Sequence, residues 1–141
     1  MYDIIKKYTS AFSVSGREKY LADIIEADLK EHATEIKRDA MGNLLVFKKG
    51  KDSSKKLMIA AHMDEIGFIV TAIDDKGYIR VSNVGGIYPI YNAYCAVRFE
   101  NGVKGIMVTD ESVKGDLKVK DLVIDIGAKD KKDATRRVSV G

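Results

Sequence analysis

Residues 56–67 read KLMIAAHMDEIG, and the pattern of the chain changes within this stretch. Its first half, residues 56–61, is a short and nearly continuous apolar run. Such a run is typical of a strand that is buried on both faces, as in a sheet covered by helices. Its second half carries a histidine, two acidic residues and a glycine. We therefore expect an α/β arrangement up to about residue 66, with polar side chains directly after a buried strand.

The segment before this run predicts helices and short strands. Ser15 and Glu18 have the spacing of a capping box, in which each side chain satisfies a backbone amide at a helix start. An apolar stripe at helical spacing follows it, formed by Leu21, Ile24, Ile25 and Leu29. Residues 2–12 suit a shorter preceding helix, and residues 35–39 and 43–49 suit strands.

From Gly67 onward the sequence predicts an all-β module. Asn101-Gly102 is a strong hairpin signal. Short strands with Gly-rich turns indicate a small antiparallel barrel or sandwich. The expected strands are residues 68–73, 78–84, 93–99, 103–109 and 122–126, and residues 130–137 suit one or two helical turns.

The expected organisation is therefore residues 1–66 as an α/β part and residues 67–141 as a β-barrel-like part. The first part offers one long helix and two or three strands, which are too few helices to cover a buried sheet. We expect it to be an incomplete domain that packs on further structure.

Composition excludes several classes of function. The chain has 141 residues, of which 45% are hydrophobic and 32% charged, with a net charge of +3. Basic and acidic residues are balanced in both parts, so nothing predicts nucleic-acid binding. The sequence contains no apolar stretch of about 18 residues, so it predicts no membrane span. The N-terminus does not resemble a signal peptide. We expect a cytoplasmic protein whose single cysteine, Cys95, is a buried small apolar residue.

His62 and Asp64 are the candidate site. Residues i and i+2 of an extended chain point to the same side, and the carboxyl ends of strands are the usual place for sites in open α/β sheets. A neutral imidazole is a common zinc or cobalt ligand. A nearby carboxylate can accept its other ring N–H and orient it. The alternative is a hydrogen-bonded histidine without a metal. Glu65 would point away from His62 and Asp64, which favours a structural or rim role.

Several ordered motifs give this site a wider context. The run from Met58 to Phe68 resembles the first metal motif of family 42 of the metallopeptidases. This family contains glutamyl and deblocking aminopeptidases, including the large tetrahedral aminopeptidases, and some members are described as endoglucanases. The resemblance covers the whole chain, through Ser15-Gly16-x-Glu18, Asp39-x-x-Gly42-Asn43, Val84-Gly85-Gly86, Ile124-Asp125-Ile126-Gly127-Ala128 and Val138-x-Val140-Gly141.

The resemblance implies a role for each part. His62 would bind one of two divalent metal ions, zinc or cobalt, and Asp64 would be the carboxylate that orients it. The family's other ligands and its general base have no counterpart in this sequence. We therefore expect an N-terminal fragment of a peptide-cleaving aminopeptidase, inactive by itself. In the family the β-rich part is a dimerisation domain, which implies a homo-oligomer.

Two further readings stay open. The chain could instead be a non-enzymatic assembly module in which the metal motif is vestigial. The polar residues 110–121 could lie near a neighbouring subunit's site or form a plain surface loop. A nucleic-acid-binding barrel is disfavoured, because the sequence lacks an aromatic-rich basic face.

Overall fold

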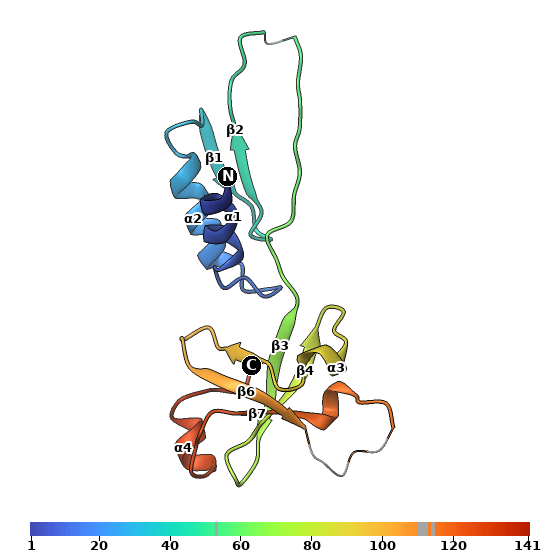
Figure 1. Ribbon diagram of the computed structural model, residues 1–141. Coiled ribbons are helices and arrows are strands. Elements are labelled where there is room, and N and C mark those ends of the chain that lie inside the picture. The colour runs from blue at the N-terminus through green and yellow to red at the C-terminus, as the bar shows by residue number, and fades with distance from the viewer. Residues whose placement is uncertain (53, 110–112, 114) are drawn as a thin grey trace. The chain divides into compact units, whose positions relative to one another are not determined.

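The computed structural model describes residues 1–52, 54–109, 113 and 115–141. The chain forms two compact units, Met1–Glu65 and Ile66–Gly141 (Figure 1). The first unit combines helices with a small β-hairpin, and the second is built on a larger antiparallel sheet. The expected mixture of helices with a small antiparallel β-structure is confirmed. Among the residues that the structure describes, none of the helices has the length and apolar character of a membrane span.

The first unit contains two helices and a two-stranded antiparallel sheet. Its elements are α1 (Tyr2–Thr9), α2 (Lys19–Leu29), β1 (Glu35–Arg38) and β2 (Leu44–Phe47). The strands pair from Glu35↔Phe47 to Arg38↔Leu44. The carboxylate of Asp39 shapes the connecting turn by accepting from the amides of Met41 and Asn43, both at 2.9 Å. All four elements were expected from the sequence.

The start of α2 differs from the expectation. The helix begins at Lys19, and no side chain caps its first turn. Leu21 and Ala22 are its buried residues, so the apolar stripe does face inward. The predicted capping box is nevertheless wrong, because the Ser15 hydroxyl bonds to a distant carboxylate, that of Asp64.

Residues 56–61 were expected to form a buried strand, and this prediction is wrong for the structure. The segment has no strand assignment, and the exposed fractions of Leu57, Met58 and Ile59 are 88%, 88% and 87%. Figure 1 shows an extended connection that leaves β2. An apolar strand is stabilised by neighbouring strands and by covering side chains, and the described residues supply neither here.

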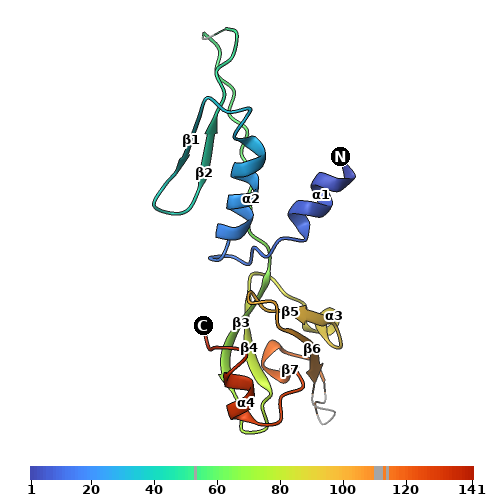
Figure 2. The ribbon, with the colours of Figure 1, turned by 90° about the vertical axis from the view of Figure 1, so that its left-hand side faces the viewer.

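The second unit is a curled five-stranded antiparallel sheet (Figures 1 and 2). The strand order is β3-β4-β7-β6-β5, so β3 and β5 form the edges. The strands are β3 (Gly67–Ile73), β4 (Ile79–Val84), β5 (Ala96–Arg98), β6 (Lys104–Thr109) and β7 (Leu122–Asp125). Three short helices complete the unit: α3 (Pro89–Asn92), the 3-10 turn η1 (Val119–Asp121) and α4 (Lys131–Thr135).

One face of this sheet carries the core of the second unit. Ile79, Met107 and Leu122 have no exposed surface. They come from three adjacent strands, β4, β6 and β7. Ala134 and Val138, from α4 and the residues after it, belong to the same cluster. Alternation along the strands therefore buries one face of the sheet.

The approach to β5 was not predicted correctly. A strand was expected from residue 93, but the chain first forms α3 and then passes through Tyr94, which has a φ of 64°. Cys95 was expected to be buried, and this is wrong: it is exposed, and its thiol lies 3.3 Å from the carbonyl oxygen of Tyr91. It sits in the turn that leads into β5, an edge strand of the sheet. Of the expected loop at residues 110–121, residues 110–112 and 114 lie outside the described part.

Candidate functional site

The candidate site forms where two distant segments of the first unit meet. Val14 and Glu65 form an isolated parallel bridge. The amide of Glu65 donates to the carbonyl of Ser13 at 2.9 Å, and the amide of Ser15 donates to the carbonyl of Glu65 at 3.2 Å. These backbone bonds fix the segment before α2 beside the residues that follow the apolar run. Glu65 thus has a structural role, carried by its backbone.

The carboxylate of Asp64 lies between two side chains. The Ser15 hydroxyl donates to Oδ2 at 2.5 Å, and Nδ1 of His62 lies 3.0 Å from Oδ1. The sequence predicted that His62 and Asp64 would lie together, and the structure places them in contact. It did not predict Ser15, because the hydroxyl comes from 49 residues earlier in the chain.

The contacts of His62 determine which ring nitrogen carries the hydrogen. Nδ1 lies 2.9 Å from the backbone oxygen of Asp64 as well as 3.0 Å from its carboxylate. A carbonyl oxygen can only accept, so a neutral ring must donate from Nδ1. Nε2 then keeps its lone pair. The side chain of His62 is 85% exposed, so this nitrogen is accessible to a ligand.

The surroundings of Asp64 favour its ionised form. The hydrogen bond from the Ser15 hydroxyl is the largest influence, and it lowers the pKa of Asp64. Partial desolvation acts in the opposite direction, and the bond to His62 lowers the pKa further. An ionised carboxylate is the form that accepts from both neighbours at once.

A tight turn holds Ser15 in place. The amide of Arg17 donates to the carbonyl of Val14 at 2.7 Å, and Gly16 has a φ of +86°. Glu18 accepts from the amide of Gly16 at 2.7 Å. The serine and glutamate of the apparent capping box therefore form a turn, in which the serine side chain remains available for Asp64.

The described residues could supply one metal ligand and the carboxylate that orients it. They could not supply a complete metal centre. No group of three or more His, Cys, Asp or Glu side chains that could hold a metal ion occurs in the described part of the chain. Catalytic zinc sites normally have three protein ligands. His62 would be one of them, and Asp64 would act through it.

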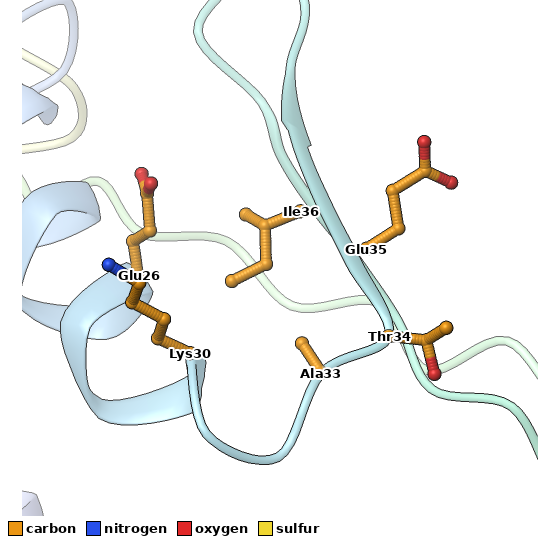
Figure 3. A pocket seen from close by; sticks show the side chains of 6 residues that line it. All are labelled: Glu26, Lys30, Ala33, Thr34, Glu35 and Ile36. Carbon is orange, nitrogen blue, oxygen red and sulfur yellow. The ribbon is translucent and has the colours of Figure 1, made fainter.

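A shallow hollow elsewhere in the first unit does not include these residues. It lies between α2 and β1 and is shown in Figure 3, lined by Glu26, Lys30, Ala33, Thr34, Glu35 and Ile36. Glu26 is already paired with Arg38, at 2.6 Å. The hollow therefore offers no set of converging groups comparable to the site at His62.

Comparison with known proteins identifies the family. A family model described as M42 glutamyl aminopeptidase matches residues 42–141. The chain belongs to the M42 family. A curated relative from Acetivibrio thermocellus is 43% identical over 143 residues, which span 100% of this chain and 43% of the relative. The lysyl aminopeptidase of Pyrococcus furiosus is 32% identical over 145 residues, spanning 94% of this chain and 41% of that protein.

Solved structures of similar proteins cover the same portion. An aminopeptidase from the archaeon Desulfurococcus kamchatkensis has a TM-score of 0.89 and 33% identity, with 99% of this chain and 41% of that chain covered. The TET1 peptidase of Pyrococcus horikoshii, which can assemble into a tetrahedron or a large octahedral shell, has a TM-score of 0.84 and 34% identity, with 99% and 44% covered. The M42 chain described here thus spans less than half the length of the relatives it matches.

Proposed function

We propose that this chain is the N-terminal part of a metal-dependent M42 aminopeptidase that removes N-terminal residues from peptides. The observation that carries the proposal is the contact between His62 and Asp64, in a member of a family of aminopeptidases. The imidazole presents a free Nε2 to solvent, and the carboxylate holds the opposite nitrogen. This is the arrangement of a metal-binding histidine with its orienting partner.

In this proposal each residue has one task. His62 binds one of two divalent ions, zinc or cobalt, and Asp64 keeps its ring oriented and in the Nδ1–H tautomer. When bound, the ions polarise the peptide carbonyl and activate a water molecule. The residues of this chain hold and aim one ligand, and they supply no general base among the groups described above.

The two parts of the chain would then have separate roles. Residues 1–66 would belong to the catalytic domain and residues 67–141 to a barrel-like insert. The exposure of Leu57, Met58 and Ile59 supports this division, since their exposed fractions of 87–88% leave an apolar segment uncovered. Further strands and helices of a catalytic domain would bury it. By itself the chain is therefore expected to bind metal weakly and to lack peptidase activity.

The experiment is metal analysis of the full-length enzyme that contains this sequence. The enzyme should hold roughly two divalent ions per subunit, and His62→Ala should lose one of them. Peptidase activity should fall by at least about 100-fold. His32→Ala, which removes the only other histidine of this sequence, should change neither quantity. Retention of both ions by His62→Ala would show that His62 is not a ligand.

A second candidate function is that the chain acts as an assembly module without enzymatic activity. The observation behind it is a segment of the second unit that lacks charged residues and exposes large side chains. Residues 81–97 contain no Asp, Glu, Lys, Arg or His. Four large side chains there are exposed: Tyr88 by 73%, Ile90 by 66%, Tyr91 by 77% and Tyr94 by 68%. We call these four residues the tyrosine patch.

The tyrosine patch suits a second copy of the same chain. In a twofold interface the same surface meets itself, so charges near the axis would face like charges. A patch without charges avoids that repulsion, and aromatic residues are enriched in interfaces. Similar proteins form a dodecamer or large shells. We propose a homo-oligomer that forms through this surface, in the enzyme as well as in the module.

A further inference from the structure

The Ser15 hydroxyl begins a chain of hydrogen bonds that ends at the imidazole of His62. It donates to Oδ2 of Asp64 at 2.5 Å, and Oδ1 of the same carboxylate lies 3.0 Å from Nδ1 of His62. We propose that Ser15 is a positioning residue, which fixes the Asp64 carboxylate. The fixed carboxylate, together with the Asp64 backbone oxygen 2.9 Å from Nδ1, then sets the orientation and tautomer of His62. The inference deepens the metal-ligand role proposed above for His62 and rests on it for its purpose.

The exposure of the site explains why such an anchor is needed. The side chains of His62 and Asp64 are 85% and 42% exposed. Little packing therefore restrains either group, and hydrogen bonds must set their rotamers. A carboxylate attached at one oxygen alone could turn about its side-chain bonds. Ser15 holds the second oxygen, so both oxygens of Asp64 are engaged and the first one stays directed at the imidazole.

Ser15 is itself held by the backbone. Its amide donates to the carbonyl of Glu65 at 3.2 Å, directly after Asp64 in the chain. The turn closed by Arg17 and Val14 at 2.7 Å fixes the direction of its side chain. An oriented imidazole thus depends on a backbone contact between residues 13–15 and residue 65. The geometry makes Ser15 specific to this task, since its hydroxyl does not cap α2.

The test uses the ring nitrogens of His62, which NMR can observe without any metal. The 141-residue chain contains only two histidines, His32 and His62, so a ¹⁵N-labelled sample gives few imidazole signals. Spectra are recorded at about pH 8.5, roughly two units above the usual pKa of an imidazole. In the unmodified chain, the ¹⁵N shifts of His62 should be well separated, with a protonated Nδ1 and an unprotonated Nε2.

The variants separate positioning from general stability. Ser15→Ala should move the two His62 shifts toward each other, as the tautomers begin to exchange, whereas Ser15→Thr should restore the separation. Ser15→Cys, whose thiol is a weak donor, should fall between them. The matched control is Ser54→Ala, which removes another serine–carboxylate bond, from Ser54 to Asp52 at 2.7 Å. The His32 signals and the backbone amide spectrum should stay unchanged throughout.

Two results would overturn the proposal. One is an unchanged separation of the His62 shifts in folded Ser15→Ala and Ser15→Cys. The other is a loss of separation that Ser15→Thr fails to restore while the backbone spectrum remains intact. Either result would mean that the hydroxyl does not set the state of the imidazole.

A separate measurement concerns the ligand role of His62. In the full-length enzyme, Ser15→Ala should weaken Co²⁺ binding by about 10- to 100-fold in calorimetry, and Ser15→Thr should recover it. A change in the His62 tautomer without any change in Co²⁺ affinity would leave Ser15 as a positioning residue and refute His62 as a ligand. The two proposals therefore fail in different ways.

Discussion

Asp133 and Arg137 form an ion pair near the end of the second unit, with 2.7 Å between Oδ2 and Nη2. The same carboxylate accepts from Arg136 at 3.0 Å and from the backbone amide of Lys129 at 3.1 Å. Its side chain is only 12% exposed. This carboxylate therefore connects the residue Lys129 before α4 with the two arginines after it. The same short helix packs Ala134 in the core.

The stability of the second unit should depend on the ionisation of Asp133. The amide of Lys129 and then the guanidinium of Arg136 lower the pKa of its carboxyl in the folded chain. A group with a lowered folded pKa stabilises the fold above its unfolded value, about 3.9 for Asp, and this stability is lost as pH falls through the folded pKa. The free energy of unfolding in urea should therefore decline below about pH 4.

The matched variants test this assignment. Asp133→Asn should lower stability at neutral pH and reduce the acid-dependent slope by up to about one proton. Asp75→Asn serves as the control, because the Asp75 side chain is 98% exposed and its contact with Lys131 spans 3.7 Å. Equal slopes for Asp133→Asn and the unmodified chain would contradict the role of Asp133.

Met107 should be a main determinant of the second unit's stability. It is completely buried, in the core cluster that also contains Ile79 and Leu122. Met107→Ala should reduce the free energy of unfolding by about 2–5 kcal/mol, through lost burial and the cavity that remains. Ile106→Ala is the control on the same strand, where the side chain is 52% exposed, and should cost less than about 1 kcal/mol. Urea titrations followed by circular dichroism would measure both, and similar losses would refute the assigned core face.

Gly105 should not tolerate a side chain. A Cβ at this position would lie 2.6 Å from Cγ2 of Ile124 and 2.8 Å from the backbone oxygen of Asp125. The neighbouring strand would have to shift, so Gly105→Ala should cost about 1–3 kcal/mol. At Gly86 a Cβ would meet nothing within 4 Å, and the backbone is not left-handed. Gly86→Ala should therefore leave the unfolding curve nearly unchanged, and an equal effect of the two variants would argue against the described β6–β7 packing.

Local patterns were sufficient to predict most of the second unit. Asn101-Gly102 correctly marked the hairpin between β5 and β6, and the short strands with Gly-rich turns correctly indicated an antiparallel sheet. Each signal depends on neighbours a few residues away. Cys95 was misplaced because its apolar neighbours suggested burial, whereas burial there depends on what covers an edge strand.

Longer-range relationships could not be predicted in the same way. The spacing of His62 and Asp64 correctly placed the two side chains together. Ser15 matched a capping box, and nothing nearby in the sequence distinguishes a capping serine from one whose acceptor lies 49 residues away. The apolar residues 57–59 have the composition of a buried strand, but a strand also needs partners. Composition specifies the preference for burial, and tertiary contacts decide whether it is met.

The tyrosine patch leads to a prediction about assembly. Tyr88 and Tyr91 already pack edge to face, with ring centroids 6.1 Å apart, so they present an ordered aromatic surface at little entropic cost. Replacing an exposed tyrosine there by lysine would place two like charges close to a twofold axis. Tyr91→Lys should therefore shift the chain from dimer or larger species toward monomer in analytical ultracentrifugation, with at least about a tenfold increase in the dissociation constant.

Tyr20→Lys is the matched control, because Tyr20 is also a well-exposed tyrosine, at 60%, but lies on α2 of the first unit. It should leave the sedimentation profile unchanged. Both variants should leave the thermal unfolding temperature of the second unit unchanged, since neither side chain belongs to its core cluster. If Tyr20→Lys dissociates the oligomer and Tyr91→Lys does not, association runs through the first unit, where the exposed apolar residues 57–59 are the next candidate. A purely monomeric unmodified chain at roughly 100 µM would exclude self-association through the tyrosine patch with micromolar or tighter affinity.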